Sequence, residues 1–115
     1  MQNNDLLYVT SGYGKIFVWD LHSKYLINII NVINSEELYN IIKYNEKYLL
    51  TCNIYGCIFV IDINQNKVIS KFNTKESFGL ISLKKLIHPK YGESILSVGR
   101  NDSIKLWTTN FIYSH

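Results

Sequence analysis

The sequence has few of the residues that build disulfide scaffolds, and it has no hydrophobic run long enough to cross a membrane. Two cysteines and one proline occur among 115 residues. Without a secretory signal, two cysteines exclude a disulfide framework. The most apolar stretch, Tyr25–Ile33, is shorter than a bilayer span and is interrupted by Asn28 and Asn31. The first five residues carry no basic segment ahead of an apolar core. We therefore expect a protein of the cytoplasm or nucleus without a membrane partner.

Charge is also scarce, and neither sign dominates. Charged residues make up 18% of the chain and the formal net charge is +3. The basic residues are dispersed, and only Lys84 and Lys85 are adjacent. A nucleic-acid-binding surface needs clustered Lys and Arg, so a nucleic-acid partner is not expected. The 47% of apolar residues is ordinary for one globular domain.

No motif that carries catalysis or holds a cofactor is present. The chain has no Gly-x-Ser-x-Gly elbow, no His-Glu-x-x-His pair and no Walker loop. The segment 12–15 (GYGK) begins like a phosphate loop, but Phe17 stands where a third glycine is needed and a strand pattern follows, which indicates a turn. Cys52 and Cys57 flank a four-residue turn and could face each other across a hairpin, yet no histidine lies near them to complete a metal site. We expect reduced cysteines, no cofactor, no metal and no enzymatic activity.

A repeat with a period of 42 to 46 residues organises the chain. Lys15–Asp20 (KIFVWD) recurs 42 residues later as Cys57–Asp62 (CIFVID), and again 46 residues after that as Ser103–Thr108 (SIKLWT). Another apolar run precedes each copy, and a few Gly, Asn, Tyr or Asp residues join the two runs, which is typical of a β-hairpin. The runs are apolar on both sides of the pleat, so these strands belong to sheets that are covered on both faces.

Two further strands are predicted between successive hairpins, which gives four strands per unit. They fall at 25–30 and 38–43 in the first interval, and at 67–72 and 80–87 in the second. The segment 34–42 also fits a short helix, because Ser35 and its neighbours form a capping-box pattern ahead of helically spaced apolar residues. We favour the strand there, because the repeat requires one and tertiary context overrides local propensity.

Four strands per period, with a third strand that closes on Trp-Asp, resemble the WD40 repeats of β-propellers. Trp19 and Asp20 form the complete dipeptide, Asp62 keeps the acid and Trp107 keeps the indole. We interpret these four as structural repeat residues: the two indoles as core packing, and the two carboxylates as strand ends that nothing pairs as acid and base. The resemblance implies an all-β fold of consecutive four-stranded antiparallel blades of a WD40-type β-propeller, incomplete in this chain.

The copies depart from the family pattern at their turns. No Gly-His dipeptide precedes an innermost strand, and the acid expected in the tight turn is replaced by Tyr13, Tyr55 and Asn101. The hydrogen-bond network that stiffens typical blades is therefore mostly absent from this sequence.

The predicted strands do not complete a ring. They give a three-stranded remnant at about 6–30, a blade at about 38–72 and a blade at about 80–113 that ends in the tail 111–113. A closed propeller needs at least four blades. Two bare end faces of roughly 300 Å² each would leave about 15 kcal/mol of apolar burial unrealised. We expect closure through further blades from the same chain, another copy or another chain.

The resemblance implies a non-catalytic scaffold for protein–protein interaction, whose turns bind a protein or peptide partner. Candidate contact residues are the turn side chains of the types common at interfaces: Tyr13, His22, Tyr55, Lys90, Tyr91 and Arg100. Two alternatives remain open at this point. One is a small self-contained β-sandwich that binds ligands, and the other is the accessory propeller of a larger enzyme.

Overall fold

The computed structural model describes residues 1–75, 79–101 and 103–108. These residues form eleven strands and no helix, so no described segment is a helix that could span a membrane. The molecule measures 42 × 30 × 24 Å along its principal axes.

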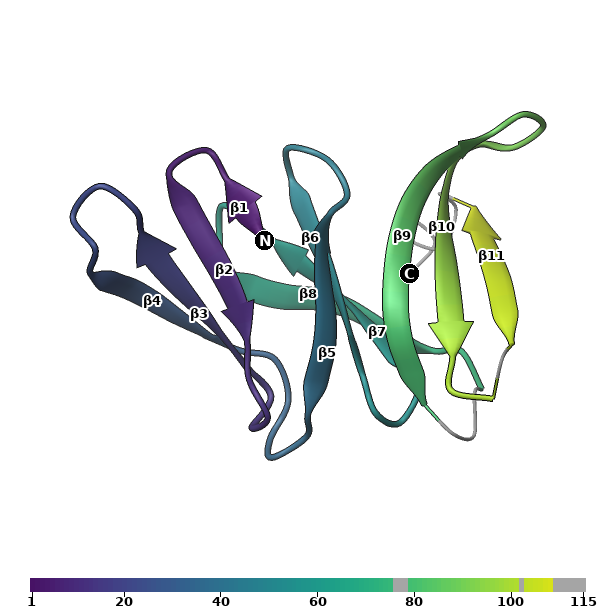
Figure 1. Cartoon of the computed structure of the whole chain (residues 1–115), viewed down its shortest axis with the longest axis horizontal. Coiled ribbons are helices and arrows are strands. Elements are labelled where there is room, and N and C mark those ends of the chain that lie inside the picture. The colour runs from purple at the N-terminus through teal and green to yellow at the C-terminus, as the bar shows by residue number, and fades with distance from the viewer. Residues whose placement is uncertain (76–78, 102, 109–115) are drawn as a thin grey trace.

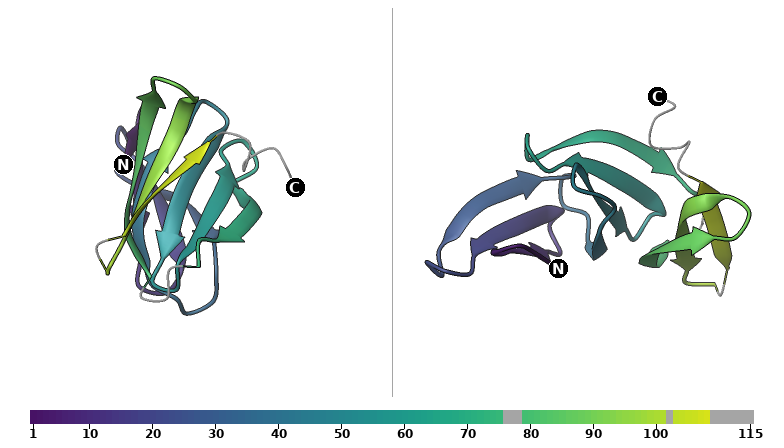
Figure 2. Two further views of the ribbon diagram at one scale, coloured as in Figure 1. Left: turned by 90° about the vertical axis from the view of Figure 1, so that its right-hand side faces the viewer. Right: turned by 90° about the horizontal axis from the view of Figure 1, so that it is seen from above.

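The strands form three antiparallel sheets in which sequence neighbours pair with each other. The first sheet contains β1 (Gln2–Asn3), β2 (Leu6–Thr10), β3 (Lys15–Asp20) and β4 (Leu26–Asn31). The second contains β5 (Leu38–Lys43), β6 (Tyr48–Asn53), β7 (Cys57–Asp62) and β8 (Lys67–Asn73), and the third β9 (Leu80–His88), β10 (Gly92–Gly99) and β11 (Ile104–Thr108). Figure 1 shows the sheets standing side by side in chain order, and Figure 2 shows how the row curves. The all-β prediction is confirmed, and three consecutive sheets do not fit a two-sheet sandwich.

The ambiguous segment after residue 34 is a strand, as the repeat requires. Ser35 takes a left-handed conformation, with φ of 57°, in the turn that leads into β5. β5 then pairs with β6 along its whole length. The first sheet holds one strand more than the sequence suggested, because the two-residue β1 pairs with β2. The predicted tail at 111–113 lies outside the described residues.

Two hydrophobic cores separate the three sheets. The core between the first and second sheets contains Tyr8, Ile16, Val18, Ile30, Leu38, Leu49, Phe59 and Ile61. The core between the second and third contains Tyr44, Leu50, Cys52, Ile58, Val60, Leu80, Leu83 and Ile95. Alternate residues of β6 and β7 therefore enter opposite cores, which explains why both strands are apolar throughout. The second sheet is covered on both faces, as the sequence predicts.

The outer faces of the first and third sheets are apolar and partly exposed. On the first sheet, Val9, Trp19 and Ile29 are 41%, 38% and 42% exposed. On the third, Ile104 and Leu106 are 66% and 38% exposed. The expectation that Trp19 is core packing is wrong for the described residues, because its strand position alternates with Val18 and so faces outward. Trp107 does pack against a core, and its Nε1 donates a hydrogen bond to Ser97 Oγ at 2.9 Å.

Candidate functional site

The strand ends form two rims, which divide the six predicted contact residues into two groups. The lower rim, as oriented in Figure 1, consists of the β2–β3, β6–β7 and β10–β11 turns and the connections that follow β4 and β8. The upper rim consists of the remaining turns. Tyr13, Tyr55 and Arg100 lie on the lower rim, and His22, Lys90 and Tyr91 lie on the upper rim. All six are exposed, but the fold does not bring them into one surface.

Small polar side chains shape the lower-rim turns in place of the expected acid. The Asn53 amide is fully buried, and its Oδ1 accepts hydrogen bonds from the backbone N–H of Tyr55 at 3.1 Å and of Cys57 at 2.8 Å. Its Nδ2 donates to Glu36 Oε1 on the preceding connection. Ser11, at the equivalent position 42 residues earlier, accepts from the backbone N–H groups two and four residues later. These two residues were missed as turn formers, although their shared repeat position is a usable signal.

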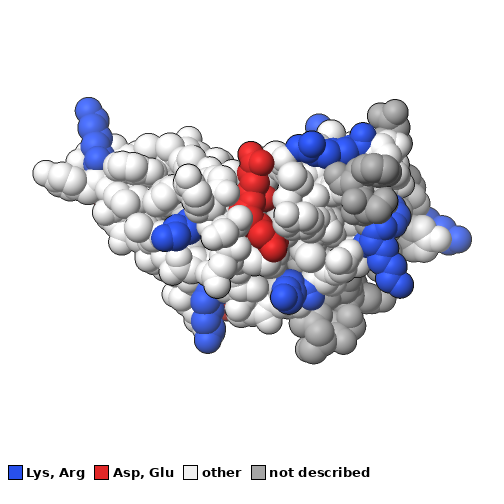
Figure 3. Space-filling view, turned by 90° about the horizontal axis from the view of Figure 1, so that it is seen from below, with Lys and Arg blue, Asp and Glu red and all other residues white. Residues whose placement is uncertain are grey.

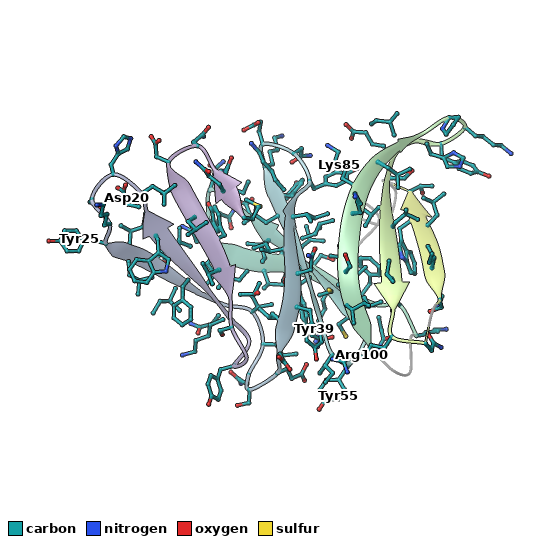
Figure 4. All side chains as sticks on the ribbon, viewed as in Figure 1. Asp20, Tyr25, Tyr39, Tyr55, Lys85 and Arg100 are labelled. Atoms are coloured by element: carbon teal, nitrogen blue, oxygen red, sulfur yellow. The ribbon has the colours of Figure 1, made fainter. Side chains whose placement is uncertain are left out.

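An aromatic and basic cluster joins the second and third sheets on this rim. The Arg100 guanidinium stacks over the Tyr39 ring, with 4.9 Å from Cζ to the ring centroid, and it donates a hydrogen bond to the Tyr39 hydroxyl. That hydroxyl also donates to Glu37 Oε2 at 3.2 Å. Burial raises the pKa of Tyr39 above its ordinary value, while the nearby Arg100 charge opposes the shift. Figure 4 shows Tyr39, Arg100 and Tyr55 close together at the bottom of the molecule.

We name Tyr39, Tyr55, Arg100 and Glu37 the rim cluster. Tyr39 was not predicted as part of it, because Tyr39 and Arg100 are 61 residues apart and only the packing of β5 on β9 brings them together. Figure 3 looks onto the lower rim and shows one acidic patch in its middle with Lys and Arg around it. The surface therefore offers aromatic rings together with charges of both signs.

The upper-rim candidates are engaged in local contacts. Asp20 Oδ1 accepts hydrogen bonds from the backbone N–H of His22 at 2.8 Å and of Ser23 at 3.3 Å, and His22 Nε2 lies 3.2 Å from Asp5 Oδ2. Asp62 likewise accepts from a backbone N–H in the following turn. The carboxylates that end the third strand of the first two units thus act as turn caps. They are not paired with each other, as expected.

Lys90 and Tyr91 fold back on their own hairpin. His88 Nδ1 accepts hydrogen bonds from the backbone N–H of both residues, at 3.0 and 3.2 Å. The Tyr91 ring lies 4.9 Å from the imidazole, and Lys90 Nζ lies 5.3 Å from the Tyr91 ring centroid. The side chains of this turn therefore satisfy one another, which makes the upper rim a weaker candidate than the rim cluster.

The two cysteines do not face each other. Cys52 belongs to the core between the second and third sheets, whereas Cys57 packs against the core between the first and second, so the thiols lie on opposite faces of one sheet. Both are free, as the sequence predicts. Within the described part of the chain, no group of acidic, histidine or cysteine side chains is arranged to hold a metal ion, and no pocket is found.

Burial makes the Cys52 thiol unreactive in the folded chain. Burial raises its pKa to about 12, so at about pH 8 only about one thiol in ten thousand is ionised. We expect a disulfide reagent to modify the half-buried Cys57 first, with Cys52 reacting only as the protein unfolds in urea. A Cys57→Ser variant provides the control, and rapid modification of Cys52 in this folded variant would contradict the assignment.

Comparison with known proteins identifies the architecture. No protein-family model and no curated protein matches the chain. Its structure is similar to the WD40 β-propeller domain of Doa1, with a TM-score of 0.76 and 19% identity over 93% of this chain and 34% of that one. The chain folds as part of a β-propeller. BamB from Moraxella catarrhalis gives a TM-score of 0.74 at 15% identity, over 93% of this chain and 30% of that one.

Designed proteins share the arrangement as well. The computationally designed Ika4 matches with a TM-score of 0.71 and 12% identity, over 94% of this chain and 62% of that one. At such identities the likeness shows the fold alone. The chain spans about a third of the length of Doa1's domain and of BamB, so its three sheets are consecutive blades of an incomplete propeller.

Proposed function

We propose that the chain is a non-catalytic interaction scaffold of the WD40 type, and that its lower rim binds a peptide segment of a protein partner. The observation that carries this is the rim cluster, in which Tyr39 and Arg100 are fixed against each other by stacking and a hydrogen bond. Tyr and Arg supply most binding energy at protein interfaces, and side chains that are already ordered lose little entropy on binding.

The neighbouring side chains favour an extended peptide with mixed polarity. Tyr55 is 63% exposed and Tyr13 is 74% exposed, so both rings can pack on an apolar peptide side chain. Glu37 and Arg100 offer one acceptor and one donor group beside them. The absence of a pocket among the described residues fits recognition of a peptide rather than of a small molecule.

Selection from a peptide-display library against the 115-residue chain tests this function. We expect the selected peptides to lose about 5- to 30-fold in affinity on Tyr55→Ala or Arg100→Ala, which corresponds to about 1–2 kcal/mol for each anchor. His22→Ala and Tyr91→Ala on the upper rim are the matched controls and should leave affinity unchanged. Affinity is measured by titration of the labelled peptide, with thermal melts to verify folding of every variant.

Two results would contradict the assignment to the lower rim. One is a library that yields no peptide binding the folded chain. The other is a set of peptides whose affinity falls on the upper-rim substitutions and not on the lower-rim ones.

A further inference from the structure

The outer face of the first sheet repeats a row of residues that the second sheet buries. Leu7, Phe17 and Trp19 lie 42 residues before Leu49, Phe59 and Ile61. The registers agree, because Leu7 pairs with Trp19 as Leu49 pairs with Ile61. The three later residues are 0%, 1% and 0% exposed, since the first sheet covers them. We call the outer row of the first sheet the leading face: Leu7, Val9, Phe17, Trp19 and Ile29.

The outer face of the third sheet is the opposite half of the same kind of contact. Leu96, Ile104 and Leu106 lie 46 residues after Leu50, Ile58 and Val60, and Leu96 pairs with Leu106 as Leu50 pairs with Val60. Leu50, Ile58 and Val60 are fully buried under the third sheet. We call the outer row of the third sheet the trailing face: Leu96, Val98, Ile104 and Leu106.

Both internal junctions of the chain follow one rule. A trailing-type row of one sheet packs on a leading-type row of the next, as Ile16 and Val18 do against Phe59 in the first core. The surface that matches the exposed leading face is therefore a trailing face. The chain carries one of each, at opposite ends of the row of sheets in Figure 1.

We propose that two copies of this chain associate head to tail, so that the trailing face of each copy covers the leading face of the other. This contact is heterologous, and it forms a ring only if the rotation closes. Two copies of three sheets give six, within the four to eight blades of closed propellers. With roughly 300 Å² on each face, the two junctions bury about 1,200 Å² in all, which reaches the size of a stable interface.

Charge does not oppose this contact. The leading face contains no charged residue. On the trailing side of the third sheet, Lys84 is the one charged residue of the described strands; it lies on the innermost strand β9, opposite Leu96. A single junction buries only about half the area of the ring, so a stable complex requires both junctions to form.

The solution mass of the full chain, measured by light scattering over a range of concentrations, tests the proposal. Twice the chain mass of 13.4 kDa is expected. Phe17→Glu on the leading face and Leu106→Glu on the trailing face each place a charge in both junctions. Each variant is therefore expected to raise the dimer dissociation constant at least about tenfold. Tyr25→Glu, on an exposed turn of the upper rim, is the matched control and should leave the mass unchanged.

Mixing the two variants distinguishes a head-to-tail contact from other contacts. A 1:1 mixture of Phe17→Glu and Leu106→Glu restores one intact junction, so a two-copy species is expected in the mixture at concentrations where each variant alone is monomeric. Thermal melts show that both variants remain folded, since both substituted positions are accessible in the single chain.

Four results would overturn the proposal. A monomeric wild-type chain would assign the end faces to blades of another polypeptide segment. A Leu106→Glu variant that stays dimeric would indicate a symmetric contact between two leading faces. A mixture no heavier than its components would exclude the head-to-tail junction, and masses that grow with concentration would exclude ring closure by two copies. The lower rim takes no part in this contact, so peptide binding and dimerisation can succeed or fail separately.

Discussion

Replacing Phe59 with alanine is expected to lower the free energy of unfolding by about 3–5 kcal/mol. Phe59 lies on the central strand β7 and is 1% exposed, in the core that joins the first and second sheets. Truncation leaves a cavity between two sheets whose backbones are fixed by hydrogen bonding, so the cavity cannot collapse fully. Such a loss is a large share of the about 5–15 kcal/mol that stabilises a typical domain. Urea unfolding followed by tryptophan fluorescence measures it.

Phe17 gives a control with the same side chain at the same repeat position. Its ring faces outward on the first sheet and stays half-exposed, so Phe17→Ala is expected to cost about 1 kcal/mol or less in the single chain. The comparison is made at concentrations where light scattering gives the mass of one copy. If Phe59→Ala does not fold, the pair Phe59→Leu and Phe17→Leu gives the same contrast with a smaller loss. Equal losses at the two positions would mean that the leading face is covered within one chain.

The repeat made most of the fold predictable from the sequence. Strand positions follow from apolar runs at a fixed offset, and the all-β class follows from runs that are apolar on both sides of the pleat. The offset also decided the conflict at 34–42, where a local helix signal lost to the pairing of β5 with β6. Burial on two faces outweighs the propensity of a few residues, which is why the repeat predicted that segment better than its own composition did.

The sequence could not show which side of each strand meets a neighbour. Trp19 and Trp107 look equivalent, but only Trp107 has a preceding sheet to pack on, so their burial differs for a reason that lies outside their local sequence. Cys52 and Cys57 flank one turn and still enter different cores.

The rim cluster could not be predicted for a related reason. Tyr39 and Arg100 meet across two sheets, and no periodic signal marks a contact between strands of different units. Local turn chemistry was more accessible, since Ser11 and Asn53 occupy one repeat position ahead of similar turns.

Replacing Asn53 with alanine is expected to cost about 2–4 kcal/mol, because buried groups left without partners lose far more than a surface hydrogen bond. The substitution removes the acceptor for two backbone N–H groups of the β6–β7 turn and the donor to Glu36. The fully buried position leaves no room for water to replace the amide. Ser11→Ala is the matched control at the equivalent turn, where solvent can replace the hydroxyl, and we expect it to cost less than about 1 kcal/mol.

Asn53→Asp separates the loss of the acceptor from the loss of the donor. A carboxylate still accepts from both N–H groups, but it lies beside the Glu36 carboxylate that the amide contacts in the wild type. Repulsion between like charges favours protonation of the pair in the folded state, so the stability gap to wild type is expected to narrow as the pH falls. Urea titrations of both proteins between about pH 7 and pH 4 measure the gap. A gap that stays constant would show that Glu36 contributes nothing to the turn, leaving the two backbone hydrogen bonds as the whole contribution of Asn53.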